Sequence, residues 1–145
     1  MRAERLFARQ RSKYRHATTD SRHGGPIAPN RLPGFKVARP NQVWVTDATG
    51  ILTGQGWLYL VAVLDLCSRR VVGWAMSPIL DAPLTSAALR MALRQRQPGR
   101  TRIVHSDRGS PFASAAYRQI RAQHRRPASI SRAGTCIANA FTQSP

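Results

Sequence analysis

Three apolar segments rich in β-branched and aromatic residues follow one another closely between residues 43 and 76, and this feature constrains the fold most. Such segments predict strands, and their short connections predict an antiparallel meander. The nearly continuous apolar character of the second segment predicts a strand buried on both faces. The predicted strands are 43–46, which ends at Asp47, then 57–66 and 71–76, with a turn from Gly50 to Gly56.

Helix and strand patterns alternate after the third strand. Asp81 is expected to cap a helix that ends at Pro98-Gly99, and Pro83 suits its first turn. Because the next strand is reached through this helix, it is expected to run parallel to the first. The remaining predicted elements are a strand at 102–105, a helix at 113–124, a short strand at 128–130 and an unfinished helix from Thr135. This order predicts an α/β fold with a mixed five-stranded sheet covered by helices.

The charge balance points to a polyanionic partner. The chain has 23 Lys and Arg against 6 Asp and Glu, a formal net charge of +17. Nucleic acid is the commonest partner of so basic a protein, although a ribosomal or membrane-surface role fits the charge as well. No apolar run approaches the roughly 20 residues of a membrane span. Cys67 and Cys136 lack metal-site spacing, so we expect reduced thiols in a cytosolic protein.

Residues 1–40 differ in composition from the rest of the chain. They are rich in Lys and Arg, with Glu4 and Asp20 as the only acids, and they contain many Gly and Pro residues. This pattern predicts a basic, largely extended N-terminal arm, with a short helix at 3–15. A disordered tail is the alternative, and either form can bind phosphate electrostatically. The domain proper is expected to span residues 41–145.

Two aspartates, Asp47 and Asp107, each follow an apolar strand, in VWVTD and RIVHSD. If the two strands are parallel neighbours, they lie about 4.8 Å apart and both carboxylates project from the same strand ends. Two converging carboxylates suit a hard cation such as Mg²⁺, which serves phosphoryl transfer on nucleic acid. The alternative is that each aspartate only caps a loop or helix.

The segment from Thr18 to Ser144 resembles the catalytic core of insertion-sequence transposases of the insertion sequence three type, relatives of retroviral integrases. The resemblance is carried by VWVTD, LDLCSRRVVGW and HSDRGS in that order, with weaker similarity in SISRAGTCIANAFTQS. It implies a ribonuclease H-like fold, DNA as partner and Mg²⁺ or Mn²⁺ as cofactor. It also implies a homo-oligomer or a mixed oligomer with an intact transposase.

The resemblance assigns two metal ligands to Asp47 and Asp107. The family's third ligand is a glutamate in a stretch that usually reads Asp-Asn-Ala-x-x-Glu-Ser, and this sequence has Gln143 in its place and Ala138 in place of the aspartate. No acidic residue follows Asp107, since the only glutamate of the chain is Glu4. Because glutamine lacks the negative charge, the metal is expected to bind weakly and transposition to be weak or absent. The resemblance also implies a core that is incomplete at its C-terminal helix.

Other polar residues have both a structural and a functional interpretation. Asp65 is expected to be structural, paired with Arg69 or Arg70, with a substitute metal ligand as the alternative. His105 either packs in the core or contacts metal or DNA. The three tryptophans, which lie in strands, are expected in the core. Arginines expected to contact DNA, one at a helix entry and the others on a solvated helix face, are Arg108, Arg118, Arg121, Arg125 and Arg126.

Three functions remain open at this stage. The first is the core of a transposase with little activity. The second is a basic DNA-binding module without catalysis, which regulates an intact transposase. The third is the product of a decayed gene. In the sequence, only Gln143 separates the first function from the other two.

Overall fold

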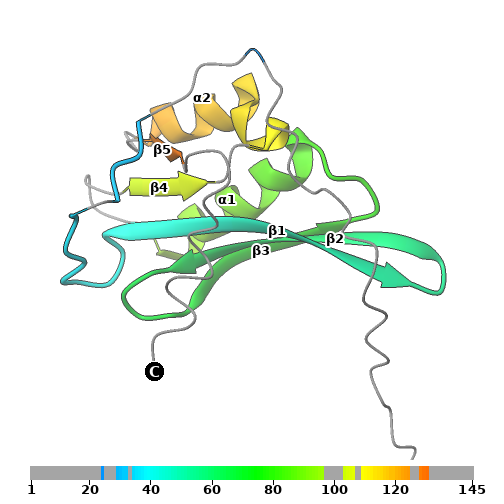
Figure 1. Ribbon diagram of the computed structural model, residues 1–145, viewed down its shortest axis with the longest axis horizontal. Helices are drawn as coiled ribbons and strands as arrows, with labels where there is room; N and C mark the ends of the chain where they lie inside the picture. Colours follow the sequence, from blue (N-terminus) through cyan, green and yellow to red (C-terminus); the bar gives the residue numbers. More distant parts are fainter. Residues whose placement is uncertain are drawn as a thin grey trace, which may run out of the picture.

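The computed structural model describes residues 24, 29–32, 34–96, 103–106, 109–124 and 128–130 (Figure 1). These residues form one five-stranded sheet with the strand order β3-β2-β1-β4-β5. Two α-helices and a short 3₁₀ helix accompany it. The elements are β1 (Val43–Thr53), β2 (Gly56–Asp65), β3 (Val71–Ser77), α1 (Ala82–Arg96), β4 (Ile103–Ser106), η1 (Ser110–Ala113), α2 (Ala115–Gln123) and β5 (Ala128–Ile130).

The strand directions confirm the predicted mixed sheet. β1 pairs with β2, and β2 with β3, in antiparallel fashion. β4 pairs parallel with β1, and β5 pairs parallel with β4. The crossover through α1 makes β4 parallel to β1, as the helix between them required. The predicted helices at residues 3–15 and from Thr135 lie outside the described residues.

The predicted turn between Gly50 and Gly56 is wrong. β1 continues to Thr53, which pairs with Gly56, so the turn consists of Gly54 and Gln55 alone. Gly50 is part of the strand and pairs with Tyr59 of β2, and a Cβ there would make ordinary contact with the Trp57 ring at 3.4 Å. Asp47 therefore lies inside β1 and not at its end.

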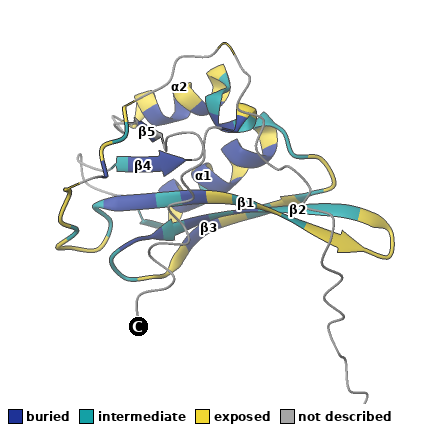
Figure 2. Cartoon of the chain, viewed as in Figure 1, coloured by how far each residue is buried: buried dark blue, intermediate teal, exposed yellow. Residues whose placement is uncertain are grey.

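The main core lies between the sheet and the two helices (Figure 2). One face of the sheet contributes Trp44, Val61, Val63 and Val104, all fully buried. From α1 and α2 come Leu89, Tyr117 and their buried neighbours. These contacts explain the apolar positions of the strands on this face.

The opposite face of the sheet is only partly covered among the described residues. A smaller cluster around Val43 and Leu66 lies near the start of β1. Of the three tryptophans expected in the core, Trp44 is fully buried there, whereas Trp57 is half-buried outside both core clusters and Trp74, in β3, is 49% exposed. The prediction that β2 is buried on both faces is wrong, because α1 and α2 cover one face and the alternate residues of β2 are half-buried.

Polar side chains cap both helices. Asp81 Oδ1 accepts a hydrogen bond from the Leu84 N–H at 3.0 Å, which confirms the predicted cap of α1. Ser114 Oγ accepts from the Tyr117 N–H at 3.2 Å, so α2 begins at Ala115 and not at the predicted Ala113. Neither described helix combines the length and apolar character that crossing a membrane requires.

Asp65 organises the turn between β2 and β3. Its side chain is fully buried and accepts hydrogen bonds from the Asn41 N–H at 3.0 Å, the Ser68 hydroxyl at 2.8 Å and the Cys67 N–H at 3.2 Å. The expected structural role is confirmed, although these partners are backbone amides and a serine and not the side chains of the two arginines that follow. Three donors on one carboxylate hold the start of β1 to the end of β2.

Replacing Gly73 by alanine should destabilise the fold. A Cβ at this position would overlap the Ala88 carbonyl oxygen and lie 2.6 Å from the Ala92 backbone nitrogen, so α1 would have to move off β3. We expect Gly73→Ala to lower the free energy of unfolding by about 1–3 kcal/mol. Urea unfolding measures this, with Gly54→Ala as the control, because a Cβ at Gly54 meets nothing within 4 Å. Equal stability of the two variants would contradict the close packing of α1 on β3.

Replacing Asp65 by asparagine should also destabilise the fold. The amide group turns one acceptor into a donor that faces other donors, and a buried unsatisfied donor costs about 1–3 kcal/mol. Asp47→Asn is the matched control: its side chain is exposed, and we expect a change within about 0.5 kcal/mol. Thermal unfolding of both variants tests this, and an unchanged Asp65→Asn protein would refute the role given to the carboxylate.

Candidate active site

The site forms where β1 passes beyond the end of β4. The parallel pairing of these strands runs from Val43 with Ile103 to Thr46 with Ser106. β1 then continues for seven residues, from Asp47 to Thr53, and pairs with β2 over this stretch. The Thr46 hydroxyl donates a hydrogen bond of 3.2 Å to the His105 carbonyl oxygen, which ties the two strands together at this point.

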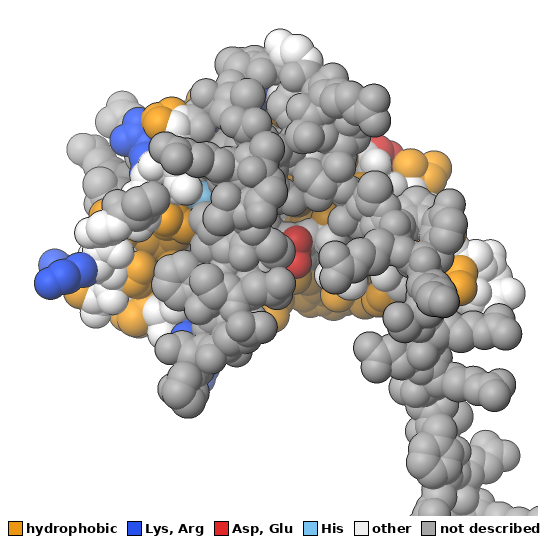
Figure 3. Space-filling view, viewed as in Figure 1, with side chains coloured by type: hydrophobic (Ala, Val, Ile, Leu, Met, Phe, Trp, Pro, Cys, Tyr) orange, Lys and Arg blue, Asp and Glu red, His pale blue; other side chains and the backbone are white. Residues whose placement is uncertain are grey.

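Asp47 is the first residue of β1 beyond that pairing, and its side chain is exposed. Its Oδ1 accepts a hydrogen bond of 2.9 Å from the Ala48 N–H. Because side chains alternate along a strand, Asp47 lies on the face opposite α1 and α2, the face of Val43 and Val45. Figure 3 shows an acidic side chain at the surface near the middle of one face of the molecule.

Asp107 follows directly after Ser106, the last residue of β4, and lies outside the described residues. The structure therefore brings the end of β4 beside Asp47 without placing the second aspartate. The other expected site residues outside the described chain are Arg108, Arg125, Arg126 and Gln143.

The remaining described carboxylates serve the fold. The three donors described above occupy Asp65, and Asp81 caps α1. Asp65 pairs with Trp44, three residues before Asp47 in β1, and so is about 10 Å from it along the strand. Within the described ranges no three His, Cys, Asp or Glu residues gather in a group that could hold a metal ion. Asp65 could therefore replace a metal ligand only if the hydrogen bonds that hold its turn were broken.

His105 has the packing role. Its side chain is 2% exposed, and its Nδ1 lies 2.9 Å from the Ser129 hydroxyl in β5. A buried imidazole at this position cannot contact DNA. Sequence reasoning missed Ser129 as the partner of His105, because the two residues are far apart in the chain and meet through the pairing of β4 with β5.

The expected arginine face of α2 is only partly correct. Arg118 is exposed, whereas Arg121 is 6% exposed, so the interpretation of Arg121 as a solvated residue is wrong. The physical reason is Tyr117: the Arg121 guanidinium lies 5.5 Å from the centre of its ring. Burial lowers the pKa of Arg121, and the Nε and Nη1 atoms have no hydrogen-bond partner among the described residues.

Tyr117 links this helix to the site. Its ring meets that of Phe112 edge to face, at 5.6 Å between centres. Burial raises the pKa of its hydroxyl, against the opposing effects of the Thr46 hydroxyl and the Arg121 charge. Tyr117 thus lies next to Thr46 on the core side of the sheet, and Thr46 is the residue whose hydroxyl joins β1 to β4. Nothing in the sequence singled out either residue, because an apolar helix position and a strand threonine are ordinary core residues.

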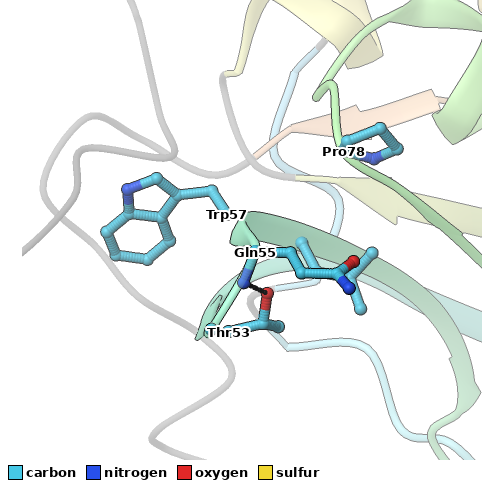
Figure 4. A pocket seen from close by; sticks show the side chains of 6 residues that line it. Thr53, Gln55, Trp57 and Pro78 are labelled. Atoms are coloured by element: carbon cyan, nitrogen blue, oxygen red, sulfur yellow. Dashed lines mark hydrogen bonds between the residues drawn. The ribbon is translucent and has the colours of Figure 1, made fainter.

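A hollow lies at the far end of β1 from the β4 pairing, at the tip of the β1–β2 hairpin (Figure 4). The Gln55 N–H donates to the Thr53 hydroxyl at 3.2 Å there. The residues that line this hollow are Thr53, Gly54, Gln55, Trp57, Leu58 and Pro78. None of them titrates, and Thr53 is about 20 Å along the strand from Asp47, so the hollow is separate from the carboxylate site.

Comparison with known proteins identifies the fold independently. Two retroviral structures are similar to the chain. One is an intasome of simian T-cell lymphotropic virus in complex with PP2A regulatory subunit B56 gamma, with a TM-score of 0.64 and 16% identity over 87% of this chain and 43% of that one. The other is the HTLV-2 integrase catalytic core domain in complex with magnesium, with a TM-score of 0.55 and 20% identity over 63% of this chain and 61% of that one. At these identities the likeness shows a shared fold, the ribonuclease H-like one.

Relatives found by sequence have a higher identity to the chain than these two structures. An insertion element IS600 protein of 31 kDa from Shigella sonnei is 44% identical over 97% of this chain and 52% of its own length. The transposase InsF for insertion sequence IS3A of Escherichia coli is 45% identical over 84% of this chain and 43% of its own length. The chain thus spans about half the length of these relatives. A model of the integrase core domain matches residues 37–136. The chain therefore belongs to the integrase core domain family.

Proposed function

We propose that the chain is the DNA-binding and metal-binding core of a DNA transposase, with Asp47 and Asp107 as metal ligands and with weak or no strand-transfer activity of its own. The observation that carries this proposal is the position of Asp47. It is an exposed carboxylate at the point where β4 ends beside β1. If the register of Thr46 with Ser106 continues by one residue, Asp107 becomes the neighbour of Asp47 on the same face.

The donor chemistry at this place fits Mg²⁺ or Mn²⁺. Carboxylate oxygens are the ligands that these hard cations prefer, and Asp47 is open to solvent whereas Asp65 is enclosed by three donors. When bound, the ion would polarise the phosphodiester and stabilise the charge that develops in phosphoryl transfer. The part of the protein is to hold the two carboxylates at a fixed separation, through the β1–β4 pairing and the Thr46 hydrogen bond to the His105 carbonyl oxygen.

Gln143 is the reason for the expected loss of activity. The sequence has no acid after Asp107, so we assign the position of the family's third carboxylate to Gln143, which carries no charge. Fewer anionic ligands bind a dication more weakly. The transition state of phosphoryl transfer depends on positioned charge, so its stabilisation should fall together with metal affinity.

The charge of the chain supports DNA as the partner. Cations on exposed side chains neutralise phosphates and release counterions. Arg118 is exposed on α2, and we keep it as a DNA contact together with Arg108, Arg125 and Arg126. Arg121 is excluded from this set because it is buried against Tyr117. A cytoplasmic, nucleoid-associated location follows from this partner and stays a prediction.

A regulatory role is the second candidate, and Gln143 is the observation that favours it. A core that binds DNA without cutting it would compete with an intact transposase or join it in mixed oligomers. The related HTLV-2 integrase core has been solved in dimeric and trimeric forms. Inhibition of an active transposase by the added chain, with no strand transfer by the chain alone, distinguishes this role from a catalytic one.

Restoring the third carboxylate should strengthen metal binding. We expect Gln143→Glu to raise Mn²⁺ affinity about tenfold, or about 1.4 kcal/mol, because one more anion faces the ion. Calorimetric titration of the full chain with Mn²⁺ measures this, and a strand-transfer assay with Mn²⁺ follows the activity. Adding Asp47→Asn to Gln143→Glu should abolish the gain. If Gln143→Glu leaves both affinity and activity unchanged, residue 143 is not the third ligand position.

DNA binding should be strongly salt-dependent. Arg118→Gln is expected to weaken binding to duplexes of any sequence and to reduce the slope of log affinity against log salt by about 0.9, the value for one lost phosphate contact. Arg121→Met is the matched control from the same helix: it removes a buried charge and should leave the slope unchanged. Fluorescence anisotropy between 50 and about 200 mM salt gives both slopes. Affinity that does not respond to salt would contradict the DNA-binding proposal.

A further inference from the structure

We propose that the segment before β1, residues 29–40, is a fixed strap that binds the phosphate backbone of DNA beside Asp47 with Arg31, Lys36 and Arg39. This inference rests on the proposed function. All three cations are exposed, and residues 29–40 contain no acid. A disordered tail could carry the same charges, so the proposal depends on how the strap is held.

The first end of the strap is anchored to β5 and β4 by buried polar groups. The Arg31 N–H donates to the Ser129 hydroxyl at 2.8 Å, and Asn30 Oδ1 lies 3.5 Å from the same oxygen. Ser129 is fully buried and also lies 2.9 Å from His105 Nδ1. Residues almost a hundred positions apart in the chain thus share one hydrogen-bonded group, drawn in Figure 1 where the blue segment comes beside β5. Breaking such a buried network leaves unpaired polar groups, so the anchor fixes the backbone of the strap.

Apolar contacts hold the middle of the strap. Leu32 is 9% exposed and packs in a cluster with Val43 and Leu66. Val37 is half-buried against the same cluster. The Phe35 N–H donates to the Leu32 carbonyl oxygen at 3.0 Å and closes a turn between these two side chains. The strap therefore covers part of the face of the sheet that α1 and α2 leave free, near the start of β1.

The second end of the strap is fixed to the start of β1. Gln42 Oε1 accepts hydrogen bonds from the Ala38 N–H at 2.8 Å and from the Arg39 N–H at 3.0 Å. The Asn41 N–H donates to Asp65 at 3.0 Å. Because both ends and the middle of the strap are held, the side chains of Arg31, Lys36 and Arg39 extend from fixed backbone positions. A bound phosphate then costs little ordering of the chain.

The strap and Asp47 share one face of the sheet. Val43, on which Leu32 packs, has the same strand orientation as Asp47 and is four residues away, or about 13 Å along β1. That span is shorter than one turn of a DNA duplex, about 34 Å. A duplex lying across the carboxylate would therefore meet the strap within the same turn, whereas the exposed arginines of α1 lie on the opposite side of the sheet.

The test compares two matched pairs of charge substitutions in the full chain. Arg31→Gln with Lys36→Gln removes two cations from the strap, and Arg90→Gln with Arg94→Gln removes two exposed cations from α1. A blunt duplex of about 20 base pairs is the probe, and the readout is the salt slope of its affinity. The strap pair should reduce the slope by about 1.8, the value for two phosphate contacts, and the α1 pair should leave it unchanged. Equal effects of the two pairs would overturn the proposal.

Anchor variants separate a fixed strap from a loose tail. Asn30→Ala and Ser129→Ala keep every cation but remove the polar anchor, and we expect each to weaken DNA binding about tenfold through lost preorganisation. Ser110→Ala, an exposed serine, is the control and should bind as the original chain does. Thermal unfolding shows which variants remain folded, and Asn30→Ala, outside the sheet, serves if Ser129→Ala does not fold.

Unchanged affinity of a folded anchor variant would overturn the fixed strap while leaving DNA binding intact. If the original chain itself fails to bind the duplex, the proposed function fails, and the strap with it. The two failures are distinguishable because the second appears before any substitution is made.

Discussion

The register of β1 with its two neighbours is the constraint on which the rest of the structure depends. On one side β1 pairs with β2 from Trp44 to Thr53, and on the other the described residues of β4 pair with it from Val43 to Thr46. Asp47 is the residue of β1 that directly follows the last described pair with β4. A slip of one residue would turn Asp47 toward the helices and bury it. Thr46 opposes such a slip, since its hydroxyl bonds the backbone of β4 and its side chain lies in the core beside Tyr117.

The two faces of the sheet have different tasks. The face toward α1 and α2 holds the main core and fixes the strands, and it is packed so closely that Gly73 leaves no room for a methyl group. The other face bears Asp47 and, near the start of β1, the strap of residues 29–40. The stabilising core and the proposed metal site thus lie on opposite faces of the sheet. This separation explains why a site with exposed charge does not compromise the core.

Strand pattern and helix spacing predicted the described strands in their order along the chain and the directions of β1 to β4, because both depend on local alternation and on chain connectivity. The length of β1 was predicted wrongly, because Gly50 was taken as a turn residue and its place in the strand depends on cross-strand pairing with Tyr59. Arg121 and Trp74 were misplaced for a related reason: burial of a single side chain depends on which neighbour covers it. Motif resemblance pointed to Asp47, but nothing local indicated Ser129 or Asn30, whose meeting depends on strand pairing between distant segments.

Paramagnetic broadening by Mn²⁺ tests the central claim, that a metal binds where β1 passes the end of β4. In a spectrum of the ¹⁵N-labelled chain, the account predicts that the amide signals of Ala48 and Ser106 broaden together at the lowest Mn²⁺ concentrations. Because the broadening falls steeply with distance from the ion, signals near Asp65, about 10 Å along the strand, should broaden less than those of Ala48 and Ser106. Broadening that begins at Asp65 or Asp81, or that affects β1 without β4, would contradict it.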